Sequence, residues 1–300
     1  MLNATHNRYF PGRVTVNPLE NFSSERTVKL HDAASAQELG IGAYEGKRVS
    51  VSASTMEHLQ LAQEALRKVK MLLPYGAGNQ TAEVLYTGGE SMARTYMVRR
   101  TPFSSPIQAA WDAARHQSGN CQEFASVSYT LLAQQSINAP VSFVKDQNWC
   151  HAYVLIGDPR DQTWGEKNTV VVDPWVRYPS AVTLQESKNR TPALPALYQR
   201  PPNAAPLPAA LTLNHIKHVT SGEVANYLRQ NQYPPIGRSY IQLNDYYGVL
   251  SSLLDERLVA KDPSTRYSSD ALSARSMDDI AQATVSRQRA AQQAWDDSPY

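Results

Sequence analysis

The stretch Ser118-Gly119-Asn120-Cys121-Gln122-Glu123-Phe124-Ala125 places a thiol directly after two turn-forming residues. Gly119 and Asn120 tolerate left-handed backbone, and the apolar side chains that follow have helical spacing, which predicts a helix that begins at or just before Cys121. The unpaired N–H groups and the dipole at a helix start favour a thiolate over a thiol. For Cys121 taken alone, the alternative is a buried cysteine that packs as a small hydrophobic side chain.

Composition and charge limit the classes of protein to which this chain can belong. The chain has 300 residues, of which 42% are hydrophobic and 9% aromatic, and its formal net charge is +2. This mixture is ordinary for a globular protein, and the absence of long basic runs gives no sign of a nucleic-acid or anionic-membrane partner. The chain has two cysteines, Cys121 and Cys150, which excludes a disulfide scaffold and fits a reducing compartment.

The sequence indicates a protein that is made in the cytoplasm. Residues 1–13 carry a proline and charges where a signal peptide needs an apolar core, and no run of apolar residues is long enough to span a bilayer. We therefore expect no cleaved signal peptide, and export by another route stays open.

Two helices are predicted upstream of Cys121. Ser54 and Glu57 form a capping-box pattern at the start of an amphipathic segment that ends near residue 73, and Pro106 follows Ser105 at the favoured first position of a second helix. Short strands are expected between them over residues 82–86 and 95–99, on either side of a Gly-Gly pair. Before the first helix, short strands are possible over 13–16 or 48–51.

Three strand candidates follow the Cys121 helix, which we expect to run to about residue 135. They cover residues 141–145, 149–156 and 169–172, and their short connections cannot hold crossover helices, so we predict an antiparallel sheet and an α+β fold. Side chains alternate along a strand, which places His151 and Tyr153 on one face and Cys150 on the other, as a core thiol. Asp173 ends the third strand, because Pro174 stops the hydrogen-bond ladder.

Cys121, His151 and Asp173 together have the chemistry of a nucleophile, a base and an orienting carboxylate. Cys121 would attack a carbonyl carbon, His151 would hold the thiolate as an ion pair and protonate the leaving group, and Asp173 would fix the imidazole tautomer. Each residue alone has a structural interpretation, but their order and context favour catalysis. The chemistry needs no cofactor and no metal. His215 and His218 lack a third ligand nearby and are interpreted as surface residues.

The sequence leaves the oxyanion hole unassigned. The backbone N–H of Cys121 is one candidate donor, and Gln117, Asn120 or the run 147–149 are candidates for another, although Gln117 and Asn120 also fit as turn residues. Trp149 and Trp175 flank the site, where they would either cover a substrate glutamine or pack in the core.

Three short motifs resemble the core of the papain-like and transglutaminase-like superfamily of cysteine enzymes. They are Gly-Asn-Cys-Gln-Glu-Phe-Ala at 119–125, His-Ala-Tyr-Val-Leu-Ile-Gly at 151–157 and Val-Val-Asp-Pro-Trp at 171–175. The resemblance covers residues 105–180 and is closest to the bacterial papain-fold toxins and secreted effectors, some of which are protein glutamine deamidases and some proteases. It implies that Cys121, His151 and Asp173 form the triad and that an acyl-enzyme forms on a protein amide.

Two departures separate the chain from an ordinary papain-like protease. Gln122 stands where such proteases and animal transglutaminases usually carry an aromatic residue, and Asp173 replaces the papain asparagine. We therefore expect glutamine deamidation ahead of peptide hydrolysis, with a host or target-cell protein as substrate. A cysteine protease of the same fold and an inactive, partner-binding scaffold are the alternatives. Arylamine acyl transfer would need an acyl-cofactor site that the sequence does not show.

Composition divides the chain into four segments. These are a polar, weakly ordered leader (1–50), the catalytic core (51–190), a proline-rich loop or linker (191–212) and a helical C-terminal extension (213–300). Within the extension we expect a helix capped by Ser221 and two more helices that cover residues 243–258 and 277–295.

Overall fold

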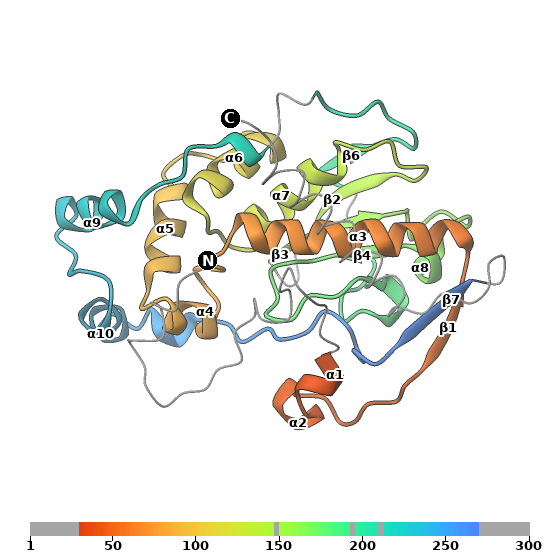
Figure 1. Cartoon of the computed structure of the whole chain (residues 1–300), viewed down its shortest axis with the longest axis horizontal. Coiled ribbons are helices and arrows are strands. Elements are labelled where there is room, and N and C mark those ends of the chain that lie inside the picture. The colour runs from red at the N-terminus through yellow and green to blue at the C-terminus, as the bar shows by residue number, and fades with distance from the viewer. Residues whose placement is uncertain (1–29, 147–149, 193–195, 209–212, 270–300) are drawn as a thin grey trace, which may run out of the picture.

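A five-stranded antiparallel sheet is the larger of the two sheets in the described residues (Figure 1). The computed structural model describes residues 30–146, 150–192, 196–208 and 213–269. The strand order is β5-β4-β3-β2-β6. The strands are β2 (Val141–Asp146), β3 (His151–Ile156), β4 (Val170–Val172), β5 (Val182–Thr183) and β6 (Tyr198–Arg200). The antiparallel sheet and the α+β class expected from the sequence are confirmed.

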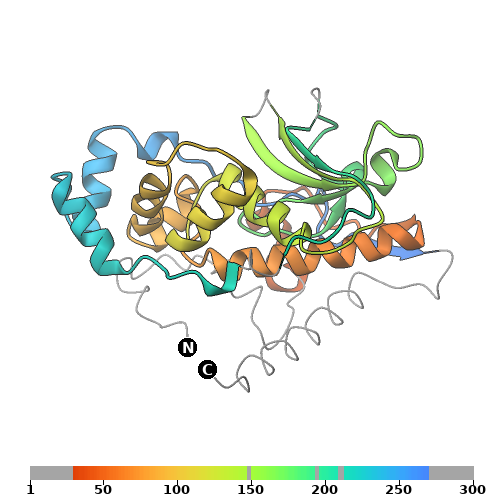
Figure 2. The ribbon, with the colours of Figure 1, turned by 90° about the horizontal axis from the view of Figure 1, so that it is seen from above.

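Two helices pack directly against this sheet, α3 (Ala53–Leu72) and α7 (Cys121–Leu132), and α6 (Pro106–His116) packs against α7. α3 runs along the sheet in both views (Figures 1 and 2). Its N-cap is Ser52, whose Oγ accepts a hydrogen bond from the backbone N–H of Thr55 at 3.1 Å, so the capping box expected at Ser54 and Glu57 is wrong. Ser52 caps the helix because its backbone is still extended, which lets its hydroxyl reach the first turn. α6 follows the N-cap Ser105, as predicted.

The two faces of the sheet belong to two different hydrophobic clusters. Ala152, Val154 and Ile156 of β3 pack in a cluster with α3, whereas Tyr153 and Leu155 pack in a second cluster with α6. The alternation predicted along β3 is therefore confirmed, and both faces of the strand are buried. α7 contributes to both clusters, which fixes its first turn against the sheet.

The strands expected over 82–86 and 95–99 are wrong, because both segments are helical. They form α4 (Thr81–Tyr86) and α5 (Glu90–Val98). Val84 and Met92 pack in a third cluster with α9 (Ser221–Gln230) and α10 (Arg238–Tyr246). Strand propensity depends on packing context, and here the buried apolar contacts of α4 and α5 outweigh it. α9 and α10 lie at the end of the molecule away from the sheet (Figures 1 and 2).

The segments before α3 and after α10 pair with each other. Residues 30–50, which the sequence assigns to a weakly ordered leader, form α1 (Leu30–Ala33), α2 (Ala36–Leu39) and most of β1 (Arg48–Val51). β1 pairs in parallel with β7 (Arg266–Ser269), so the strand expected over 48–51 is confirmed. Tyr267 of β7 is buried, and its hydroxyl accepts a hydrogen bond from the backbone N–H of Thr183 at 3.0 Å.

The remaining predictions along the chain have mixed outcomes. The helix expected after Ser221 is present, but its N-cap is Thr220 and Ser221 is its first residue. The helix expected over 243–258 is wrong, because α10 ends at Tyr246 and Gly248 has a positive φ of 69°. The proline-rich segment contributes β6, which pairs with β2. The helix expected over 277–295 lies outside the described residues. The other short elements are α8 (Gly165–Asn168) and 3₁₀ turns at Leu184–Glu186, Leu213–His215 and Leu250–Ser252. Among the described helices, none has the length and apolar character needed to cross a membrane.

Candidate active site

Cys121 is the first residue of α7, as the sequence predicts. Asn120 is the N-cap with extended backbone (φ −115°, ψ −165°), and its N–H donates to Oε2 of Glu123 at 2.6 Å. The helix ends at Leu132, slightly before the expected end near 135. The thiol therefore lies in the first turn, where backbone N–H groups have no partner within the helix and the local field stabilises negative charge.

The turn before Cys121 is fixed to a segment that lies more than forty residues earlier in the chain. Gly119 pairs with Ala77 in a parallel bridge, and its carbonyl accepts a hydrogen bond from Gly78 N–H at 3.0 Å. A Cβ on Gly119 would lie 2.3 Å from Cβ of Glu123, so only glycine fits at this position. These contacts hold Cys121 against the segment 76–79.

A buried carboxylate lies two residues after Cys121. The side chain of Glu123 is 5% exposed, and the Arg99 guanidinium contacts it at 3.2 Å (Nη2 to Oε2) and 3.3 Å (Nε to Oε1). An unpaired negative charge at this place would oppose a thiolate on Cys121, and Arg99 offsets that charge. The sequence shows the helix cap but not this arginine, which comes from the segment just after α5.

His151 and Asp173 form a buried pair on neighbouring strands. Nε2 of His151, the first residue of β3, lies 2.7 Å from Oδ2 of Asp173, which follows β4 directly. Both side chains are at most 3% exposed. Asp173 also accepts hydrogen bonds from the backbone N–H of Trp175 at 3.3 Å and from Nδ2 of Asn189 at 3.4 Å. The carboxylate is therefore held by three donors, of which one is the imidazole.

The protonated form of His151 is strongly favoured. Burial lowers the pKa of the imidazole, but the charge of Asp173, its hydrogen bond, and the hydrogen bond and charge of Cys121 together raise the pKa from 6.5 to about 10. Because Nε2 faces Asp173, Nδ1 is the ring nitrogen that remains for Cys121. The site can thus hold an imidazolium between a carboxylate and a thiolate.

Cys150 is not the buried core thiol that the strand pattern predicts. It is exposed and precedes β3 with a positive φ of 50°, so strand alternation does not extend to it. Its carbonyl oxygen lies 3.8 Å from Sγ of Cys121, within hydrogen-bond reach of the thiol. Both cysteines are free and line the same pocket.

Two aromatic rings contact the imidazole of His151. The ring of Trp175 lies 4.8 Å from that of His151 between centroids, and the ring of Tyr153 stacks at 5.6 Å. Trp175 is 3% exposed, so it packs in the core beside the site, and it excludes water from the pair of His151 and Asp173. Trp149, the other predicted tryptophan, lies outside the described residues, as does the rest of the run 147–149.

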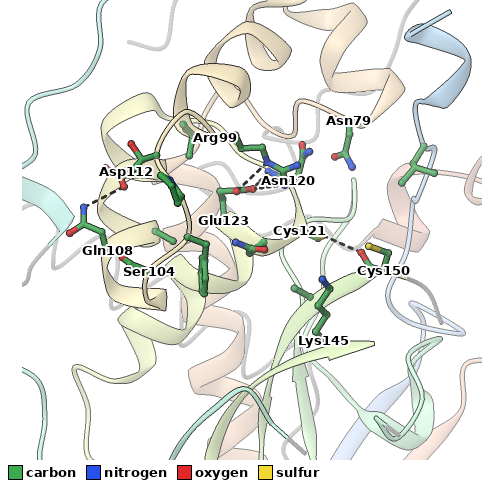
Figure 3. Close-up of a pocket in the computed structure, with 18 residues that line it drawn as sticks. Asn79, Arg99, Ser104, Gln108, Asp112, Asn120, Cys121, Glu123, Lys145 and Cys150 are labelled. Atoms are coloured by element: carbon green, nitrogen blue, oxygen red, sulfur yellow. Dashed lines mark hydrogen bonds and ion pairs between the residues drawn. The ribbon is translucent and has the colours of Figure 1, made fainter. Parts of the chain in front are cut away.

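A pocket of about 540 Å³ opens directly over Cys121 (Figure 3). Of the candidate oxyanion residues, Asn120 lines this pocket, but Gln117 does not. Gln117 is instead the C-cap of α6 with a left-handed φ of 61°. The residues around the rim are Asn79, Arg99, Phe103, Gln108, Asp112, Gln122, Lys145 and Leu254. Sequence reasoning missed these because they come from separate elements and share no local pattern.

No protein-family model matches the chain, and no curated protein or solved structure is significantly similar to it. Within the described ranges, no three His, Cys, Asp or Glu side chains gather in a way that would hold a metal ion. His215 and His218 are both exposed. The chemical meaning of the site therefore rests on its own geometry.

Proposed function

We propose that the protein is a cysteine-dependent acyl-transfer enzyme that acts on protein amides, with a fold core of the papain-like and transglutaminase-like type. The observation that carries this proposal is the buried pair of His151 and Asp173 beside Cys121, together with the pocket that Cys121 lines. A buried ion pair contributes little to stability compared with well-packed apolar side chains. Its place next to a half-buried thiol at a helix start is explained better by catalysis than by structure.

The proposed reaction follows from the position of each group. The Cys121 thiolate attacks the amide carbonyl carbon, and Nδ1–H of His151 gives its proton to the departing nitrogen, so that the C–N bond breaks and a thioester forms. The neutral imidazole then takes a proton from water, which attacks the thioester and releases the acid and the thiol. Asp173 keeps Nε2 protonated through both steps and stabilises the imidazolium.

Glutamine deamidation is our first choice of reaction, with ammonia as the leaving group. It is supported by Gln122 and Asp173, the two departures from papain-type proteases, and by the resemblance to bacterial toxins and effectors. That resemblance also leads us to propose a protein of a host or target cell as substrate, reached by export without a cleaved signal peptide. Peptide hydrolysis by the same triad is the second reaction, and it needs the same thioester step.

The first test is the rate of iodoacetamide alkylation of Cys121 as a function of pH, with Cys150 followed in the same mass-spectrometric digest. Cys150 is exposed and Cys121 only half-buried, so access alone favours Cys150. We expect Cys121 to react faster than Cys150 at neutral pH, because the neighbouring imidazolium of His151 favours its thiolate. The His151→Ala variant is expected to abolish this difference.

The result also separates an enzyme from a partner-binding scaffold. A Cys121 that is inert, or that reacts equally well without His151, contradicts the catalytic proposal and favours the scaffold. If the thiol is activated, the reaction is identified by incubating a target-cell lysate with the wild type and with Cys121→Ala. Conversion of glutamine to glutamate that depends on Cys121 indicates deamidation, and new peptide termini indicate proteolysis.

A further inference from the structure

Asn79 lies in the turn between α3 and α4 and is held next to the catalytic cysteine by its backbone. Its carbonyl accepts a hydrogen bond from the N–H of Leu254 at 2.9 Å, and its neighbour Gly78 donates to Gly119 at 3.0 Å. Asn79 and Cys121 line the same pocket, and Figure 3 shows the Asn79 side chain directed toward the side on which Cys121 lies. The position of this amide is therefore coupled to the turn that presents the thiol.

The orientation of the Asn79 amide follows from one hydrogen bond. Nε1 of Trp175 donates to Oδ1 of Asn79 at 2.9 Å. An indole N–H is only a donor, so the atom that faces it must be the oxygen, which fixes the amide against a flip. Nδ2 and its two N–H groups are then turned away from Trp175. Within the described part of the chain, no protein group accepts a hydrogen bond from that nitrogen.

The backbone N–H of Cys121 supplies a second donor. As the first residue of α7, Cys121 has an N–H that the helix does not use, and no described residue accepts from it. Asn79 and Cys121 both line the pocket, and two such donors beside a nucleophile are the arrangement that stabilises a developing oxyanion. Of the candidates from the sequence, Gln117 does not line the pocket. Asn120 does, but among the described residues no hydrogen bond orients its amide, because its buried Oδ1 has no donor, whereas Trp175 orients Asn79.

We propose that Nδ2 of Asn79 is the side-chain donor of the oxyanion hole, and that it acts together with the backbone N–H of Cys121. This assignment rests on the proposed function, because it is defined by the tetrahedral intermediate of acyl transfer. Trp175 is then a positioning residue with two contacts. Its ring packs against His151, and its N–H orients Asn79, so one buried side chain aligns the general acid and the oxyanion donor.

Two reactions of the same thiol separate this role from a structural one. Alkylation by iodoacetamide needs the thiolate but develops no oxyanion. Acylation by p-nitrophenyl acetate does develop one: the thiolate attacks the acetyl carbon, a C–S bond forms, the C–O bond to the leaving group breaks, and the charge departs on p-nitrophenolate. The ratio of the acylation rate to the alkylation rate of Cys121 at one pH therefore reports oxyanion stabilisation, corrected for thiol reactivity.

The variant to compare with the wild type is Asn79→Asp. Aspartate keeps an oxygen that accepts from Trp175 but replaces the NH₂ donor by a second oxygen. We expect the ratio to fall by about tenfold or more, given that removal of one oxyanion donor typically costs about 10²–10³ in rate and that an activated ester depends on the hole less than an amide does. Asn79→Ala gives a second variant without the added charge. Asn226→Asp, on the exposed side of α9, is the matched control and is expected to leave the ratio unchanged.

The outcomes distinguish the two proposals. If both Asn79 variants have the same ratio of acylation to alkylation as the wild type, the role of Asn79 is contradicted and the proposed cysteine chemistry is not affected. A wild type that shows no acylation of Cys121 contradicts the proposed function and the oxyanion assignment together. Alkylation serves as the control for folding, because an unchanged pH profile in the Asn79 variants shows that the thiol and the imidazole are still in place.

Discussion

At the scale of single residues, the site depends on a charge that is stabilised inside the protein. Burial disfavours an imidazolium, yet Asp173 and Cys121 raise the pKa of His151 to about 10. Asp173 is itself held by Trp175 and Asn189, so its position is fixed before the imidazole is protonated. The imidazolium is therefore maintained by geometry that does not depend on a bound substrate.

The variant Asp173→Asn tests this arrangement through the pH dependence of stability. The pKa of His151 is higher in the folded chain than in the unfolded chain, so its protonation contributes fully below pH 6.5, and the contribution is lost as pH rises through about 10. We expect the free energy of unfolding of the wild type to fall across this window, and the fall to be smaller in the variant. At pH 6.5 the variant should be less stable by about 1–3 kcal/mol.

Urea unfolding at several pH values measures both effects. Asp245→Asn on the exposed side of α10 is the control, and its stability profile should follow that of the wild type. If the free energy of unfolding of Asp173→Asn depends on pH in the same way as that of the wild type, the carboxylate does not set the pKa of His151.

Gly119 gives a second prediction at this scale. Gly119→Ala would bring a Cβ to 2.3 Å from Cβ of Glu123, and such overpacking costs about 1–3 kcal/mol. The shift that relieves the contact also displaces Cys121, so alkylation of Cys121 at neutral pH should slow. Gly222→Ala is the matched control, because its nearest contact is Oγ1 of Thr220 at 3.7 Å and the space is open. Equal stability of the two variants, measured by thermal unfolding, would contradict the tight packing at Gly119.

The sequence predicts the three members of the proposed triad but not the other residues of the site, for a physical reason. Cys121, His151 and Asp173 lie beside local signals, namely a turn before a helix, an alternating strand and a proline after a strand. Asn79 and Arg99 have no such signal, because the first is defined by a contact with Trp175 and the second by a contact with Glu123. Strand alternation predicts Cys150 as a core thiol, but the residue has a positive φ and lies outside the strand, so the alternation does not apply to it.

At the scale of elements, local signals predicted helices well where capping residues and buried spacing agree. α6 and α7 satisfy both conditions and were found close to their observed starts. The sequence predicts strands at α4 and α5. It does not reveal that they are helical, because the contacts that stabilise them are with α9 and α10, which lie far away in the sequence. The length of α10 was misjudged because a run of apolar residues continues beyond its end at Tyr246.

The first turn of α7 gives a prediction about the ion pair that supports it. Arg99→Gln removes the cation from the buried Glu123 carboxylate and leaves a negative charge near Cys121. We expect slower alkylation of Cys121 at neutral pH, and a loss of stability of only about 1 kcal/mol, because the arginine is half-exposed. Arg238→Gln, at an exposed position at the start of α10, should change neither quantity. If the alkylation rate of Cys121 is the same in Arg99→Gln as in the wild type, the charge of Glu123 does not affect the reactivity of the thiol.

At the scale of the whole molecule, β1 and β7 join the two ends of the described chain. Asp262 and Ser264 accept hydrogen bonds from the backbone of Glu45 and Gly46, and Tyr267 enters the cluster formed by α3 and the sheet. The sequence does not indicate this pairing, because both strands are short and more than two hundred residues apart.

The variant Tyr267→Phe tests how strongly this closure supports the fold. Burial raises the pKa of the Tyr267 hydroxyl to about 12, and removal of the hydroxyl leaves the N–H of Thr183 without its acceptor. We expect a loss of about 1–3 kcal/mol in urea unfolding. Tyr246→Phe is the control, since Tyr246 is 83% exposed. If both variants unfold alike, the contact between β7 and the sheet adds nothing to stability.

The pairing of β1 with β7 also sets the order of events while the chain is being made. β7 follows Asp173 by roughly a hundred residues, which take about 5–20 s to add at typical rates of protein synthesis. During this interval all three residues of the triad have been translated, but the strand that completes the first cluster has not. A stalled chain that lacks β7 therefore has its nucleophile but not its finished core. Cys121 of such a chain is therefore expected to reach its full reactivity only after β7 has been made and has paired with β1.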